Sequence, residues 1–121
     1  MIIAVDFDGV LCKDCFPSIG EPNLGIMLLL IQARIAGHRL ILWTCRENVT
    51  KDGELHTMLT EAIEWCKGFG LEFDAVNKNL PSEWDEYEGQ RRKVTADIYI
   101  EDKIVGFDIN EVEEFLYDLC K

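Results

Sequence analysis

Two short apolar runs near the start of the chain enclose a segment with helical periodicity. Residues 2–5 read IIAV, and residues 39–43 read RLILW after the helix breaker Gly37. Runs that are apolar throughout are typical of parallel strands that are buried on both faces of a sheet. The segment between them has apolar residues at steps of three and four, which predicts a helix with Pro22 in its first turn. The apolar face of this helix consists of Leu24, Met27, Leu28, Ile31 and Ile35. The pattern predicts a βαβ unit, in which the crossover between parallel strands is right-handed.

The same alternation continues through the rest of the chain. Residues 54–67 form a second helical pattern that ends before Gly68, and apolar runs at 73–76 and 98–100 predict two more strands. The polar stretch 77–95 between these strands is long enough for the crossover that parallel strands require.

Two further helices complete the predicted architecture. A short helix is predicted near Ser82, and a last helix is predicted after Asp108, whose side chain can cap it, with Glu111 three residues further on. We therefore predict one domain, residues 1–121, with a three-layer, Rossmann-like α/β fold and a central, mainly parallel sheet of about four strands.

The charge of the chain restricts its partners. With 23 acidic and 12 basic residues the net charge is −11, which opposes nonspecific binding to nucleic acid. The cluster Arg91, Arg92 and Lys93 is typical of a solvated loop. No apolar run approaches the ~18 residues that a membrane span needs, and the opening MIIAVDF lacks a basic leader segment. We expect a cytoplasmic protein that binds no membrane.

The cysteines are predicted to be reduced, and Cys12 and Cys15 are predicted to lie in a loop. The number of cysteines, five, is odd, which fits free thiols better than a disulfide framework. Cys12 and Cys15 form a C-x-x-C pair, but no second pair and no H-x₃₋₅-H follows to complete a zinc site. Pro17 and Gly20 surround the pair with turn residues, whereas a redox pair is expected at the start of a helix.

Polar residues follow all of the predicted strands, at the edge where an open parallel sheet binds ligands. After successive strands they are Asp6, Asp8 and Gly9; Thr44, Cys45 and Arg46; Asn77 and Lys78; and Glu101, Asp102 and Lys103. Taken singly, each has an ordinary structural explanation, such as a turn or a helix cap. Four carboxylates at adjacent strand ends, however, repel one another unless a cation neutralises them. Oxygen ligands of this kind predict Mg²⁺.

Three segments resemble motifs of one enzyme superfamily. IIAVDFDGVL resembles the first motif of the haloacid dehalogenase-like (HAD-like) superfamily, an apolar strand followed by D-x-D-G. LILWTCR resembles its second motif, and ADIYIEDK resembles its fourth, a strand that ends in two acidic residues. The three segments follow the order of the superfamily and cover nearly the whole chain. The resemblance implies a HAD-like fold and a Mg²⁺-dependent phosphatase or phosphotransferase that forms an aspartyl-phosphate.

The resemblance also implies roles for the matching residues. Asp6 would be the nucleophile, and Asp8, on the same side of an extended chain, would be the general acid and base. Mg²⁺ would be held by the Asp6 side chain, the Asp8 carbonyl oxygen and Asp102. Glu101 would be a further ligand or a partner of the ligands, and Thr44 would bind phosphoryl oxygens. Other residues at this edge, Gly9, Cys45 and Arg46, are predicted to contact the substrate.

A lysine is expected to balance the charge of these carboxylates, and Lys78, Lys93 and Lys103 are the candidates. Lys78 follows the third strand, whereas Lys93 precedes the fourth and would lie roughly 16 Å or more from Asp102, at about 3.3 Å per residue. Lys103 is at the correct edge but directly follows the acidic pair. We therefore predict Lys78, although a K-x-x-A-D register in similar proteins keeps Lys93 open.

The chain departs from the superfamily pattern in two ways. The pair Glu101 and Asp102 stands where small relatives commonly have two aspartates, which leaves the division of metal ligation open. The segments after Gly9 and Thr44 are too short for a cap domain, so the resemblance is to capless members with an open site. The flap 11–20 and the stretch with Trp84 and Tyr87 could cover this site in part.

Two other functions compete with the phosphatase. A receiver domain has a similar length, Mg²⁺ and an acidic pair, but its third strand ends in an acceptor aspartate, where this chain has Val76 and Asn77. A HAD-fold binding module without activity is the stronger alternative, although the intact Asp6 and Asp8 oppose it. The predicted substrate is a phosphorylated small molecule or an exposed phosphate on a larger molecule.

Overall fold

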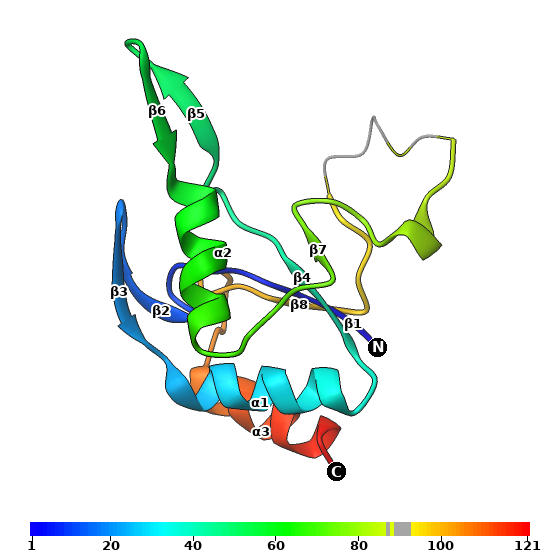
Figure 1. Cartoon of the computed structure of the whole chain (residues 1–121). Helices are drawn as coiled ribbons and strands as arrows, with labels where there is room; N and C mark the ends of the chain where they lie inside the picture. The colour runs from blue at the N-terminus through cyan, green and yellow to red at the C-terminus, as the bar shows by residue number, and fades with distance from the viewer. Residues whose placement is uncertain (87, 89–92) are drawn as a thin grey trace.

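A computed structural model describes residues 1–86, 88 and 93–121 (Figure 1). The elements in chain order are β1 (Ile2–Val5), β2 (Cys12–Cys15), β3 (Ser18–Pro22), α1 (Leu24–Ile35), β4 (Arg39–Leu42), β5 (Asn48–Lys51), β6 (Glu54–Thr57), α2 (Met58–Gly68), β7 (Ala75–Val76), the 3₁₀ helix η1 (Pro81–Glu83), β8 (Ile98–Ile100) and α3 (Ile109–Leu119).

A parallel sheet of four strands forms the centre of the protein, in the order β7-β4-β1-β8. Within it Ile3 pairs with Leu40 on one side and with Ile98 on the other. The predicted α/β fold and its central parallel sheet are confirmed. Because β1 and residues 40–42 of β4 are buried, their apolar residues recur without polar interruption, which is the signal that predicted these strands.

The two faces of the sheet are covered differently. Ile3 and Val5 point into a core shared with α1, α2 and α3, whereas Ile2 and Ala4 point to the other face. That second face is covered by Leu80 and other residues of the connection between β7 and β8. The helix predicted near Ser82 is the single turn η1, and most of this third layer is irregular where it is described (Figure 1). Tyr87, Arg91 and Arg92 lie outside the described residues.

Two β-hairpins project from the carboxyl edge of the sheet (Figure 1). One pairs β2 with β3 between β1 and α1, and the other pairs β5 with β6 between β4 and α2. They occupy the segments after Gly9 and Thr44 that are predicted to be too short for a cap domain, and within the described residues each segment holds only a two-stranded hairpin. The flap predicted at 11–20 is the hairpin β2–β3.

The prediction of a helix from residue 54 is wrong, because residues 54–57 form β6. Asp52 and Gly53 both have positive φ, 53° and 78°, and link Lys51 to its partner Glu54. A two-residue Asp-Gly turn with positive φ at both positions is the preferred connection of a tight hairpin. The helix α2 therefore begins only at Met58.

The helix ends follow local capping rules. Asn23 caps α1, with its side chain accepting a hydrogen bond from the backbone N–H of Ile26 at 3.3 Å. Pro22 ends β3 and is not in the first turn of the helix, which corrects that prediction. Asp108 caps α3 as predicted and accepts from the N–H of Asn110 at 2.9 Å. Over the described residues, no helix has the length and apolar character to cross a membrane.

Candidate active site

The carboxyl ends of β1, β4 and β8 open into a cavity of about 320 Å³. Among the residues predicted for the site, those that line this cavity are Asp6, Asp8, Thr44, Cys45 and Glu101. Asp14 and Phe16, to which the sequence analysis gave no catalytic role, also line it, and so does Lys103, one of the three candidate lysines. The first two belong to the hairpin β2–β3, so this hairpin forms one wall of the cavity.

Asp6 directly follows β1 and is fixed by its backbone. Its N–H donates to the carbonyl of Ile100 at 2.9 Å, and one carboxylate oxygen accepts from the N–H of Phe7 at 2.8 Å. Burial raises the pKa of the Asp6 carboxyl to about 6, against the opposing effect of the Phe7 hydrogen bond. The negative charges of Asp102, Glu101 and Asp8 contribute to this rise. Among the described residues, therefore, no positive group near Asp6 offsets the cost of ionising this partly buried carboxyl.

Asp102 has one buried carboxylate oxygen that is an unsatisfied hydrogen-bond acceptor among the described residues. Its Oδ1 is buried and makes no hydrogen bond to any residue that the structure describes. The other oxygen, Oδ2, packs so closely on Gly9 that a Cβ at position 9 would lie 2.0 Å from it. A buried carboxylate oxygen without a partner is costly, and such groups are normally paired or bound to a metal.

These residues fit Mg²⁺. Within the described ranges, no three His, Cys, Asp or Glu side chains converge as a metal cluster. Mg²⁺ does not need three, because it usually keeps several waters and takes one or two carboxylates from the protein. Asp6 and Asp102 would supply two carboxylates, and the Asp8 backbone carbonyl is the third predicted ligand.

Asp8 is bound by Arg46, which the sequence analysis assigned to the substrate. The guanidinium donates from Nε to Oδ2 of Asp8 at 2.9 Å and from Nη2 to Oδ1 at 2.8 Å. Arg46 is only 1% exposed and does not line the cavity. The geometry thus brings Arg46 to the site as a partner of Asp8, and its predicted contact with substrate stays a prediction.

Thr44 is held in a turn that leaves its hydroxyl proton available. Its Oγ1 accepts from the N–H of Arg46 at 3.2 Å, and its own N–H donates to Oδ1 of Asn77 at 2.8 Å. Asn77, after β7, has a positive φ of 52°, which asparagine tolerates better than most residues. The Thr44 hydroxyl group donates its proton to none of the described residues, so it can donate to a ligand oxygen.

The candidate lysines lie in different places. Lys103 lines the cavity, with its Nζ 3.7 Å from Oδ2 of Asp14. Lys78 is exposed and is not among the residues around the cavity. The ammonium of Lys93 lies 4.6 Å from the centre of the Tyr99 ring. Lys103 therefore fits the role of the charge-balancing lysine best, and the role of Lys78 stays a prediction that no contact supports.

The C-x-x-C pair lies in β2 and not in a loop. Cys12 is buried and Cys15 exposed, and both are free thiols. The Sγ of Cys12 is 3.9 Å from the carbonyl oxygen of Phe7, where it can donate a weak hydrogen bond.

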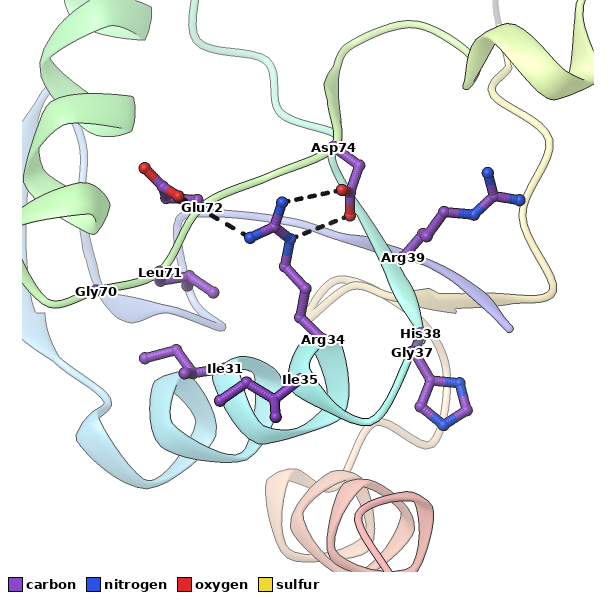
Figure 2. A pocket seen from close by; sticks show the side chains of 10 residues that line it. All are labelled: Ile31, Arg34, Ile35, Gly37, His38, Arg39, Gly70, Leu71, Glu72 and Asp74. Atoms are coloured by element: carbon purple, nitrogen blue, oxygen red, sulfur yellow. Dashed lines mark hydrogen bonds and ion pairs between the residues drawn. The ribbon is translucent and has the colours of Figure 1, made fainter.

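A second, larger cavity lies at the opposite edge of the sheet, beside the amino ends of β4 and β7 (Figure 2). It has a volume of about 410 Å³. Its central side chain, Arg34, donates to both carboxylate oxygens of Asp74, at 3.3 and 3.0 Å (Figure 2). Asp74 also accepts from the N–H of Leu40 at 2.8 Å. Because these charges satisfy one another, we interpret this cavity as structural.

A solved structure of a conserved protein from Bacteroides thetaiotaomicron is similar to this chain. The two share 40% sequence identity and a TM-score of 0.77, over 98% of this chain and 90% of that protein. This chain belongs to the same family as that conserved protein. No profile of a known family matches, and no curated protein is similar enough to be a relative. Membership of this family establishes the fold, and the function has to be argued from the residues of the site.

Proposed function

We propose that this protein is a Mg²⁺-dependent phosphatase of the HAD-like type that forms an aspartyl-phosphate on Asp6. The observation that carries the proposal is the buried Oδ1 of Asp102, which has no partner among the described residues. The negative charge of Asp102 also acts on a second carboxylate that is costly to ionise. A cation at this position would satisfy both groups. The D-x-D-G motif after β1 identifies the second carboxylate, Asp6, as the nucleophile that the HAD-like resemblance implies.

In the proposed reaction, a carboxylate oxygen of Asp6 attacks the phosphorus of a phosphate monoester. As the new bond forms, the bond from phosphorus to the ester oxygen breaks, and Asp8 gives its proton to that oxygen. In the second half, Asp8 takes a proton from a water molecule, whose oxygen attacks the phosphorus. The bond between phosphorus and Asp6 then breaks, which releases inorganic phosphate and restores both carboxyl groups.

The remaining residues bind and orient the phosphate. Mg²⁺, when bound, would neutralise negative charge on the phosphoryl group and on its ligands. The hydroxyl group of Thr44 would donate a hydrogen bond to a phosphoryl oxygen, and the Lys103 ammonium would attract the phosphate dianion into the cavity.

We propose that the protein is located in the cytoplasm.

The shape and charge of the cavity support a proposal for the substrate class. The cavity is open, and Phe16 and Asp14 of the hairpin β2–β3 lie at its wall. An open cavity admits a small phosphorylated molecule or a phosphate that protrudes from a larger one. Because Asp14 and Glu101 add negative charge, we propose that the part of the substrate beyond the phosphate is neutral or positive.

The proposal is tested with p-nitrophenyl phosphate, with and without Mg²⁺. We expect Mg²⁺-dependent turnover by the native protein and a loss of several orders of magnitude in Asp6→Asn, whose fold should be retained. Acid quenching of the native enzyme during turnover should trap phosphate on the protein, and the Asp6→Asn protein should trap none. Absence of turnover together with Mg²⁺-dependent phosphate binding would favour the binding module, and normal turnover by folded Asp6→Asn would refute the mechanism.

A further inference from the structure

Arg46 is the most deeply buried charged side chain in the described part of the protein, with 1% of its surface exposed. A guanidinium in such a place is retained only when its donors are paired. Asp8 receives two of its N–H groups, and backbone carbonyl oxygens of the hairpin β2–β3 receive others. The ring of Phe7 also lies against the guanidinium, with its centre 4.9 Å from Cζ.

The turn of the hairpin β2–β3 is attached to the same guanidinium. The carbonyl oxygens of Pro17 and Ser18 accept from Nη1 and Nη2 of Arg46 at 3.2 and 3.0 Å. The ring of Phe16 stacks on it with its centre 5.3 Å from Cζ. One side chain thus joins three segments that are distant in sequence: the loop after β1, the turn between β2 and β3, and the loop after β4.

The orientation of Asp8 depends on this junction. Both hydrogen bonds that its carboxylate makes to described residues come from Arg46. A bidentate pair uses one lone pair on each carboxylate oxygen and leaves a second lone pair on each, so the Asp8 carboxyl group can still face a ligand while Arg46 holds it. The Asp8 side chain is 16% exposed, and it lines the cavity.

We propose that Arg46 is a positioning residue that aligns Asp8 for proton transfer and makes this alignment depend on the seated position of the hairpin β2–β3. The inference rests on the proposed phosphatase function and adds to it. When the turn of the hairpin is seated, its carbonyl oxygens fix the plane of the guanidinium, and the guanidinium fixes the plane of the Asp8 carboxylate. When the hairpin moves away, Asp8 loses its orientation although Asp6 and the metal ligands stay in place.

The test exploits the different need of two substrates for a proton. Phenyl phosphate and p-nitrophenyl phosphate have similar shapes, but phenolate is a much poorer leaving group than p-nitrophenolate and gains more from proton donation. The measured quantity is the ratio of kcat/KM for p-nitrophenyl phosphate to that for phenyl phosphate. We expect Arg46→Lys, which cannot form the bidentate pair, to raise this ratio at least about tenfold, since general acid catalysis contributes about 10²- to 10⁴-fold in full.

Three variants make the result specific. Asp8→Asn should raise the ratio most, and adding Arg46→Lys to Asp8→Asn should not raise it further, because Arg46 acts through Asp8. Arg34→Lys is the matched control: it alters another bidentate pair, with Asp74 at the opposite edge, and should leave the ratio unchanged. Phe16→Ala removes one stacking partner at a position that is 54% exposed, and should raise the ratio less than Arg46→Lys does.

The outcomes separate this inference from the function on which it rests. If the native protein hydrolyses neither substrate, the proposed function fails and the inference fails with it. If the native protein is active but Arg46→Lys lowers kcat/KM equally for both substrates, Arg46 acts in folding or substrate binding and the inference is overturned. If Arg46→Lys does not fold, Phe16→Ala decides, and an unchanged ratio in that variant overturns the inference.

Discussion

Replacing Gly9 by alanine should disrupt the proposed Mg²⁺ site through Asp102. Gly9 has a φ of +88°, and a Cβ at this position would lie 2.0 Å from Oδ2 and 2.4 Å from Cγ of Asp102. These distances are far inside van der Waals contact, so either the loop after β1 or the Asp102 carboxylate must move. Gly53 is the matched control, because its φ is +78° and no atom lies within 4 Å of its would-be Cβ.

Both substitutions should lower the stability of the protein through backbone strain, but only Gly9→Ala should also weaken Mg²⁺ binding. Left-handed backbone costs a residue with a Cβ about 1–2 kcal/mol, which applies to Gly9→Ala and Gly53→Ala alike. A loss of this size lowers the melting temperature by roughly 4 °C per kcal/mol in a domain of this size. Only Gly9→Ala also displaces Asp102, and disturbing the groups that orient a metal ligand typically costs about 10- to 100-fold in metal affinity.

The assay is thermal unfolding at increasing Mg²⁺ concentration, followed by activity at the same concentrations. A ligand that binds the folded state stabilises it by about 1.4 kcal/mol at ten times its Kd, so the melting temperature reports binding without turnover. We expect Gly53→Ala to respond to Mg²⁺ at native concentrations, and Gly9→Ala to need about 10- to 100-fold more. A folded Gly9→Ala protein with the native Mg²⁺ response would refute the role of the Gly9–Asp102 contact.

Three further predictions follow from the charges of the described residues. Lys103→Ala should lower kcat/KM for p-nitrophenyl phosphate about tenfold or more, whereas Lys78→Ala should be nearly silent; the reverse result would restore Lys78 to the site. Burial acts to raise the pKa of Asp74, but hydrogen bonds, chiefly from Arg34, outweigh burial and lower this pKa. Asp74→Asn should therefore lower the free energy of unfolding at neutral pH, and its difference from the native protein should close as the pH falls through and below about 4. A difference that stays constant with pH would contradict this. Because the pKa of Asp6 is raised to about 6, the ionised form of Asp6 destabilises the fold. Asp6→Asn should therefore have a higher melting temperature than the native protein in Mg²⁺-free buffer above pH 6, and this increase should vanish toward pH 4. A lower melting temperature of Asp6→Asn above pH 6 would contradict the prediction.

The central fold was predictable because its signals are local and mutually consistent. The uninterrupted apolar run of β1 follows from burial on both faces, and the cap of α3 follows from Asp108 and its neighbours. The hairpin β5–β6 was missed because Leu55 fits the helical periodicity that continues into α2. The decisive signal, the dipeptide Asp52-Gly53, was present in the sequence and has a specific turn geometry.

The site was predictable only in part. That Asp6, Asp8 and Glu101 share one cavity follows from parallel strands, which bring their carboxyl ends to one edge. The partner of Asp8 could not be predicted in the same way, because Arg46 is 38 positions away and nothing local indicates that its side chain turns inward. The position of Lys103 depends on the path of the loop after β8, which strand direction alone does not determine.

The two bidentate arginine–aspartate pairs of this protein differ in what they imply. Arg34 is 40% exposed, and its pair with Asp74 loses little solvation and contributes modestly to stability. The pair of Arg46 with Asp8 is largely removed from water, and the lost solvation of the two charges offsets much of their attraction. An apolar pair of similar volume would stabilise the fold at least as well, so stability does not explain why charged groups stand there. A function that needs the Asp8 carboxylate at the edge of the cavity does explain it, and Arg46 is then the group that makes burial of this carboxylate tolerable.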